Sequence, residues 1–234
     1  MDTEPGLRER KKLRTRLLIA ETARRLFAER GFEAVSVAEI AREAEVSEAT
    51  VFNYFPTKED LVYHGMEAFE AELLDAIRDR PAGVPALEAF GRFVIQPRGF
   101  LAAEDETARQ ALLAASRMIA ASPALLARER QILARYTESL AALLRDETAA
   151  GPDDLRPWVV ASTLVGLHGA LIGYLRRRLL DGTPDVRRLA GELRREGEKA
   201  IELLRGGLGD YAVRQPCTAT GHPMPATRRK DPSQ

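Results

Sequence analysis

Apolar residues recur every three or four positions along most of the chain, which is the spacing of one face of an α-helix. In the second part of the chain this pattern predicts helices over residues 85–95, 107–120, 124–149, 155–180 and 186–204. A long helix is also predicted from Lys58 until Pro81 ends it, with Val62, Met66, Phe69, Leu73 and Ile77 on its apolar face. Since the sequence has no convincing alternation of period two, we predict an all-α fold.

The first part of the chain predicts one longer helix followed by two short ones. The longer helix starts near Leu13, and Gly31 ends it; its apolar stripe is Leu13, Leu17, Ala20, Ala23 and Phe27. Ser36 begins the next helix with a capping box, because Glu39 follows at the third position. Ser47 is the N-cap of the last helix. The pattern is typical of a helix-turn-helix.

The last of these short helices has one inward and one outward side. Val51 and Phe55 share the inward side, so Glu48, Ala49, Thr50, Phe52 and Asn53 are left outside the small core. A short exposed helix that carries amide and hydroxyl groups and is braced by another helix fits the major groove of DNA. Taken alone, the stretch is also compatible with an ordinary helical hairpin.

Residues 13–62 resemble the N-terminal DNA-binding domain of the TetR family of bacterial transcriptional regulators. The matching segments are Thr22 and Ala23, residues 26–32 (LFAERGF), residues 37–41 (VAEIA), Val46 and Ser47, and residues 54–61 (YFPTKEDL). The resemblance implies a homodimer, a recognition helix in the major groove and a separate ligand-sensing domain. Glu45 departs from the family, which usually has Gly there, and Phe52 stands where a Tyr hydroxyl commonly touches phosphate.

The resemblance also implies which residues contact DNA. The predicted DNA-binding residues are Ser36, Ser47, Glu48, Ala49, Thr50, Asn53, Tyr54 and Lys58. We expect Thr50 and Asn53 to face base edges, and Tyr54 and Lys58 to hold phosphates.

Charge divides unevenly along the chain. The formal net charge of the whole chain is +0, which says nothing about nucleic acid. A basic cluster near the N-terminus, suited to phosphate, consists of Arg8, Arg10, Lys11, Lys12, Arg14 and Arg16. We therefore predict a basic arm over residues 1–12, a helix-turn-helix domain over 13–62, an effector-binding and dimerisation domain over 63–205, and a disordered tail over 206–234. A solvated arm without a DNA contact is the alternative for the first segment.

The sequence shows no catalytic or metal-binding pattern. His64, His168 and His222 are far apart and have no metal-ligand spacing with Cys, Asp or Glu, and no Gly-rich phosphate loop is present. We predict a protein that is not an enzyme and that needs no metal or cofactor. Neither a membrane span nor a signal peptide is expected, so the predicted location is the cytoplasm.

The second domain is expected to enclose an effector pocket, as the resemblance implies. Its predicted ligand-binding residues are Phe93, Phe100, Arg117, Met118, Trp158 and His168. We expect them to converge on one cavity for an apolar or amphipathic small molecule. For His168, a role as an ordinary core histidine is the alternative.

These features predict a repressor that leaves its palindromic operator when a small molecule binds. The helices over 155–180 and 186–204 are expected to pair with their copies in a four-helix bundle, since Gly166, Ala170 and Gly173 form a smooth stripe. Alternatively, the stripe packs inside one chain. The rival functions are a DNA-binding dimer without an effector and a helical-bundle enzyme.

Overall fold

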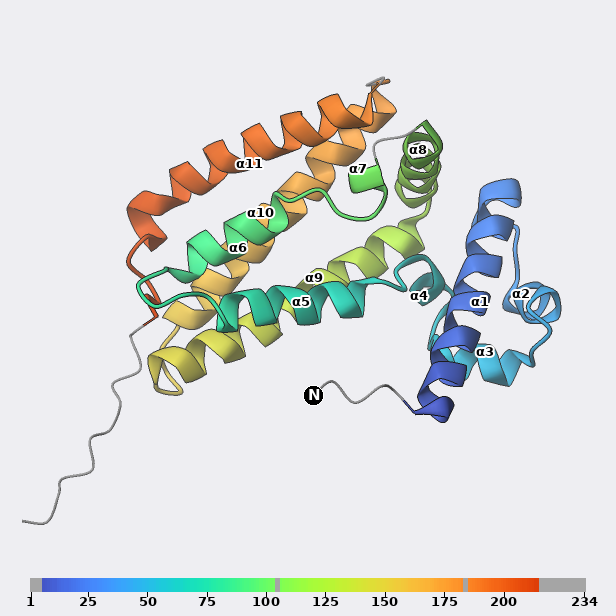
Figure 1. The fold of residues 1–234 in the computed structure, drawn as a ribbon, viewed down its shortest axis with the longest axis horizontal. Helices are drawn as coiled ribbons and strands as arrows, with labels where there is room; N and C mark the ends of the chain where they lie inside the picture. Colours follow the sequence, from blue (N-terminus) through green and yellow to red (C-terminus); the bar gives the residue numbers. More distant parts are fainter. Residues whose placement is uncertain (1–5, 104–105, 183–184, 215–234) are drawn as a thin grey trace, which may run out of the picture.

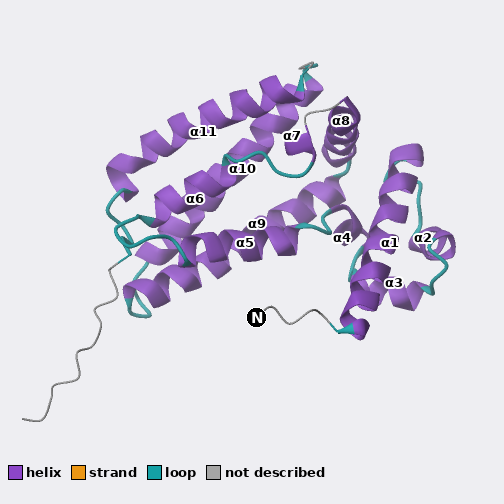
Figure 2. Cartoon of the chain, in the orientation of Figure 1, coloured by secondary structure: helices purple, strands orange, loops and turns teal. Residues whose placement is uncertain are grey.

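The computed structural model describes residues 6–103, 106–182 and 185–214, which form helices joined by turns (Figures 1 and 2). Within these residues the one β-type pairing is an isolated bridge between Pro85 and Val213, and the predicted all-α class is confirmed. The helices are α1 (Leu7–Arg30), α2 (Val37–Glu43), α3 (Glu48–Tyr54), α4 (Lys58–Val62), α5 (Met66–Arg78), α6 (Ala86–Val94), α7 (Phe100–Ala103), α8 (Glu106–Ala121), α9 (Pro123–Thr148), α10 (Arg156–Leu180) and α11 (Val186–Leu208).

The helices form a head, α1–α4, and an elongated body, α5–α11 (Figure 1). The head and body have separate apolar cores. The head core contains Ile19, Ala20, Ala23, Leu26, Phe27, Phe32, Val35, Ile40, Ala41, Ala44, Val51, Phe55 and Leu61. The body core is built around α10, which lies against α8, α9 and α11. Two cores mean that the orientation of the head depends on the contacts between them.

The helix α10 supplies much of the body core. Among the described helices it alone is long and apolar enough to meet the length and composition of a membrane span. Its apolar side chains at Val160, Leu164, Val165 and Leu171 are buried in the core of the body. Packing inside the bundle therefore accounts for this face of α10, whereas Trp158, Val159 and Leu180 of the same helix are exposed.

The first helix begins earlier than predicted. Because α1 starts at Leu7, the described residues of the predicted basic arm are helical from that point. The first turns of α1 extend past the head core, whose first buried residue is Ile19. Leu13 and Leu17 are consequently 57% and 53% exposed, and their predicted place on the inward stripe is wrong.

The predicted long helix after Lys58 is broken. The helix α4 ends at Val62 and α5 starts at Met66. Gly65 is a weak helix former, and the Tyr63 hydroxyl donates to the carbonyl of Leu125 at 3.0 Å. A ring nitrogen of His64 bonds the Leu61 carbonyl at 3.2 Å. The break, residues 63–65, separates the head from the body.

The predicted disordered tail starts too early, because α11 continues to Leu208 and residues 211–214 return to the start of α6. Arg80, 3% exposed, holds this return. Its guanidinium donates to the carbonyl of Ala212 at 2.6 Å and to that of Val84 at 2.9 Å, and it pairs with the Glu147 carboxylate. Residues 215–234 lie outside the described residues, so the predicted disorder of that part of the tail stays a prediction.

His168 is buried beneath the aromatic side chains of the body. Its ring stacks on Phe69 with 5.0 Å between the ring centroids and 13° between the planes. The side chain is 8% exposed, and neither ring nitrogen has a hydrogen-bond partner among the described residues. Burial lowers the pKa of His168 to about 4. The fold therefore holds this imidazole neutral.

We expect His168→Leu to reduce the loss of stability in mild acid. Above the ordinary pKa of 6.5, His168 is neutral in the folded and the unfolded chain. As the pH falls from 6.5 towards 4, only the unfolded chain binds the proton, so the free energy of unfolding decreases. By pH 5 the decrease is about 2 kcal/mol, which the substitution should remove.

Urea unfolding of the wild type and His168→Leu at pH 7 and pH 5 measures this difference. At pH 7 the variant should be at least as stable, because the two buried nitrogens without partners are gone. If both proteins lose the same free energy of unfolding between pH 7 and pH 5, His168 is not the group that takes up the proton on unfolding.

Candidate nucleic-acid interface

The helix α3 is anchored on one side and exposed on the other, as predicted. Val51 and Phe55, each 1% exposed, fix it to the head core. Glu48, Ala49 and Asn53 are exposed, and Phe52 is 47% exposed. Figure 1 shows α3 at the outer edge of the head, next to the N-terminal half of α1. The outward side of α3 is therefore open to a large partner.

The hydroxyl groups at the starts of α2 and α3 cap these helices. The Ser36 hydroxyl accepts from the Glu39 amide at 3.2 Å, and the Glu39 carboxylate accepts from the Ser36 amide at 2.9 Å, which confirms the capping box. The Ser47 hydroxyl accepts from the Thr50 amide at 3.1 Å and lies 2.8 Å from the Thr50 hydroxyl. The backbone N–H of Ser36 and the Arg30 guanidinium lower the pKa of Glu39 to about 2. These bonds fix the direction in which α3 leaves the turn.

The turn between α2 and α3 contains a residue in the left-handed region. Glu45, which stands where the resembled family usually has Gly, has φ 54°. The Val46 amide donates to the Ala41 carbonyl at 2.9 Å, so the tight turn forms although Glu45 carries a Cβ. A non-glycine residue in this conformation costs about 1–2 kcal/mol.

The two predicted phosphate contacts at the C-terminal end of α3 have different surroundings. Tyr54 is half-buried against the head core. Lys58 places its ammonium 4.2 Å from the centroid of the Phe32 ring. This cation–π contact holds Lys58 near the N-terminus of α4. Its contact with a phosphate remains a prediction.

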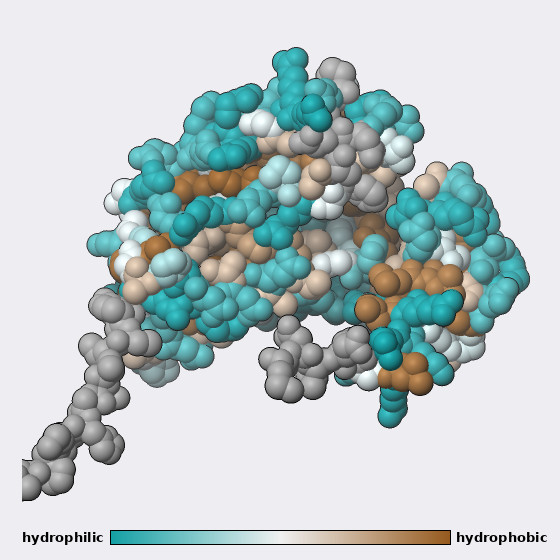
Figure 3. Space-filling view, viewed as in Figure 1, coloured by the Kyte–Doolittle hydropathy of each residue, from teal (hydrophilic) through white to brown (hydrophobic). Residues whose placement is uncertain are grey.

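The N-terminal half of α1 carries most of the basic cluster. Arg8, Arg10, Lys11, Lys12 and Arg14 are exposed along it. Arg16, the last basic residue of the cluster, pairs with Glu67 at 2.9 Å and lies over the Phe55 ring. Figure 3 also shows apolar surface over α1, where the exposed large residues are Leu7, Leu13, Leu17 and Leu18.

The predicted effector residues do not converge on one cavity, so that prediction is wrong. Phe93 and His168 both contact Phe69, whose ring centroid is 5.3 Å from that of Phe93. Trp158 is 42% exposed near the start of α10, because it lies on the side of the helix opposite the buried Val160. The side chain of Phe100 lies outside the described residues. Within the described chain, no group of three or more His, Cys, Asp or Glu side chains is placed to hold a metal ion.

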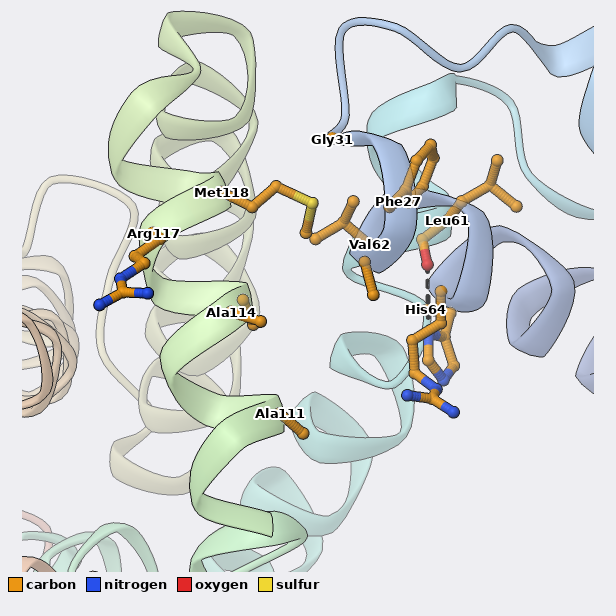
Figure 4. Close-up of a pocket in the computed structure, with 12 residues that line it drawn as sticks. Phe27, Gly31, Leu61, Val62, His64, Ala111, Ala114, Arg117 and Met118 are labelled. Carbon is orange, nitrogen blue, oxygen red and sulfur yellow. Dashed lines mark hydrogen bonds between the residues drawn. The ribbon is translucent and has the colours of Figure 1, made fainter. Parts of the chain in front are cut away.

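Arg117 and Met118 instead lie at a cavity between the head and α8, with a volume of about 520 Å³. The head side is formed by α1 and α4, and the body side by α8 (Figure 4). In Figure 4, Met118 points towards Val62 and Phe27, whereas the Arg117 guanidinium points away from the head. The cavity joins segments far apart in the chain, so periodicity alone could not reveal it.

One turn of α9 forms the firm joint between head and body. Leu125, 0% exposed, belongs to the head core although it lies on a body helix. Ser122 caps α9, and its hydroxyl donates to the Glu33 carboxylate at 2.7 Å. The Arg128 guanidinium donates to Asp60 at 2.8 Å. Burial is the main cause that raises the pKa of the Tyr63 hydroxyl, which bonds the Leu125 carbonyl.

Comparison with known proteins identifies the head. Residues 19–63 match the family model described as bacterial regulatory proteins, tetR family. The chain is 39% identical over 85 residues to the HTH-type transcriptional regulator TcmR of Streptomyces glaucescens, and the match covers 36% of this chain and 38% of TcmR. The first three curated relatives are matched over 38%, 16% and 24% of their own lengths. These sequence matches therefore concern mainly the head.

Solved structures extend the likeness to the whole fold. Salmonella enterica GusR has a TM-score of 0.50 and 22% identity, and the match covers 89% of this chain and 98% of GusR. The SmeT–triclosan complex has a TM-score of 0.51 and 16% identity, and the match covers 91% of this chain and 99% of SmeT. At these identities the likeness establishes a shared arrangement of helices.

We expect Glu45→Gly to stabilise the head by about 1 kcal/mol, because glycine adopts a positive φ without a Cβ clash. Urea unfolding measures the change. Glu45→Ala is the matched control, since it removes the carboxylate but keeps the Cβ, and it should give no such gain. Equal stabilisation by both substitutions would assign the effect to charge and contradict the backbone argument.

Proposed function

The chain belongs to the tetR family of bacterial regulatory proteins, and from this premise we propose that it is a DNA-binding transcriptional repressor released by a small molecule. The observation that carries the proposal is the exposed side of α3, held at a fixed angle by the caps at Ser36 and Ser47. A protein with this role acts in the cytoplasm, where its DNA is. The relatives' names as transcriptional regulators support a role other than catalysis.

The proposed contacts with DNA follow from the geometry of the head. With α3 in the major groove, Asn53 reads base edges, and Thr50 lies beside it at the start of the helix. The exposed cations of α1 supply phosphate contacts, which are independent of sequence. Lys58 and Tyr54 border the same surface. Base reading and phosphate binding thus involve different residues, so they can be separated by mutation.

We propose a homodimer that binds a palindromic operator and pairs through α10 and α11. Gly166 and Ala170 are exposed in the single chain, and a Cβ added to Gly166 would meet nothing within 4 Å. The alternative in which this stripe packs inside one chain therefore does not hold for these two positions. Exposed large apolar side chains lie at the N-cap residue Leu155 and, along α10, at Trp158, Val159 and Leu180.

Release by an effector requires a ligand that prefers one arrangement of the two heads. If the ligand binds more tightly to an arrangement of the heads that does not fit the operator, it weakens DNA binding. The loss of DNA-binding free energy is at most the difference between the ligand's binding free energies for the two arrangements. SmeT, which shares the fold of this chain, forms a complex with triclosan, so this arrangement of helices can accommodate a small molecule. For this chain we propose an apolar or amphipathic effector.

We expect Asn53→Ala to relax the choice of DNA sequence. The first step is to select bound DNA from a random pool and to measure the affinity for the selected site and for random DNA. A bidentate Asn–adenine contact contributes roughly 1–3 kcal/mol of discrimination, so the ratio of the two affinities should fall about tenfold or more. Lys12→Ala is the control: it should weaken both affinities alike and lower the salt dependence. Equal losses on both DNAs for Asn53→Ala would remove Asn53 from the base-reading set.

We expect Ala170→Arg to give a folded monomer. The new guanidinium would lie in the proposed interface, where a second copy of α10 leaves no space for it. Sedimentation measures the oligomeric state, and circular dichroism checks the fold. Ala142→Arg, at an exposed position of α9, is the control and should remain dimeric. A dimeric Ala170→Arg protein would refute this placement of the interface.

A further inference from the structure

We propose that the cavity between the head and α8 is the effector site, that it binds a small, uncharged and mainly apolar molecule, and that its occupation turns the head. This inference rests on the proposed function for its regulatory meaning, whereas the binding itself does not depend on that function. It places the effector at the joint of head and body, rather than among the side chains around Phe69 and His168.

The wall of the cavity selects for apolar ligands. The side chains of Phe27, Leu61 and Val62 form the head side, and Met118 reaches across from α8 (Figure 4). On α8, the alanines at 111, 114 and 115 leave the space that larger side chains would fill. A volume of about 520 Å³ falls in the range of sites for small organic ligands. Met118, with three rotatable bonds, can adapt to the shape of a bound molecule.

The charges at the rim favour an uncharged ligand. The Arg24 guanidinium is already paired with Glu21 through bonds of 2.8 Å and 2.5 Å. This bond is the largest cause that lowers the pKa of Glu21, so the carboxylate stays ionised and balances Arg24. Arg117 directs its guanidinium away from the head (Figure 4). A carboxylate ligand would therefore lose its water and would have to compete with Glu21 for Arg24.

The position of the cavity connects a ligand to the angle of the head. One wall, at Val62 and His64, adjoins the break between α4 and α5, and the opposite wall is α8. A molecule that separates α4 from α8 acts beside this break, where the two helices are joined by a turn in which the Met66 amide donates to the Tyr63 carbonyl at 2.9 Å. It meets firm resistance at Leu125, which is fixed in the head core. The head would therefore turn about Leu125, and the two α3 helices of a dimer would change their spacing.

N-phenyl-1-naphthylamine, an uncharged apolar dye, is the probe for the site, and its fluorescence reports binding. We expect the full-length protein to bind this dye more tightly than its sulfonated relative ANS. Ala114→Trp fills the cavity from an exposed position of α8, so the affinity for the dye should fall at least tenfold. Ala120→Trp, on α8 but outside the cavity, is the matched control and should bind like the wild type. Unchanged dye binding by Ala114→Trp, or preference for ANS, overturns the proposal.

The second measurement is the affinity for the selected DNA with and without saturating dye. We expect a ratio of about ten in the wild type and in Ala120→Trp, a usual size for coupling between two sites. In Ala114→Trp the ratio should be about one. A wild type that binds the dye but keeps its DNA affinity overturns the turning of the head. Failure of the protein without dye to bind DNA would instead overturn the proposed function, and the dye-binding result would still locate the site.

Discussion

The burial of one body residue in the head core fixes how the reading surface is held. Leu125 of α9 is 0% exposed among the side chains of the head. A core as small as that of the head gains a large share of its stability from each buried leucine, about 1.5–3 kcal/mol. Tyr63 and Arg128 surround this contact with bonds to Leu125 and Asp60. The head therefore cannot reorient freely, and α9 sets the direction in which α3 points.

The second connection between head and body, at residues 63–65, is a turn and not a continuous helix, and the proposed movement uses it as the hinge. Residues 63–65 interrupt the helical path from α4 to α5, while α8 and α9 meet at a sharp bend of 99° next to Leu125. In the proposed movement, a rotation of α8 would reach the head by two routes: through the contacts of α9 at Leu125, and through the side chains of α8 that line the cavity. The distant end of the body is stiffened in another way, because buried Arg80 connects α5, α9 and the residues after α11. The proposed movement therefore involves the end that carries the head.

Local signals predicted the head well, whereas contacts between distant segments were missed. The caps at Ser36 and Ser47 depend on residues three positions apart, so the sequence alone revealed them. The break at residues 63–65 depends on a bond from Tyr63 to α9, and the return of residues 211–214 depends on Arg80. The effector residues were misplaced for the same reason. An apolar side chain such as Trp158 can pack in a core, line a pocket or lie at an interface between two copies, and the residue type alone does not tell which.

The energies at the joint are of the size that regulation requires. Coupling between two binding sites usually amounts to about 1–3 kcal/mol. The Arg128–Asp60 pair is partly exposed, with side chains 26% and 14% accessible, so it contributes on the order of 1 kcal/mol. Breaking that pair as the head turns therefore costs about as much free energy as a ligand supplies when it binds one arrangement several-fold more tightly than the other. Removing Leu125 from the head core would cost more, so the joint acts as a pivot that a ligand can turn without separating head from body.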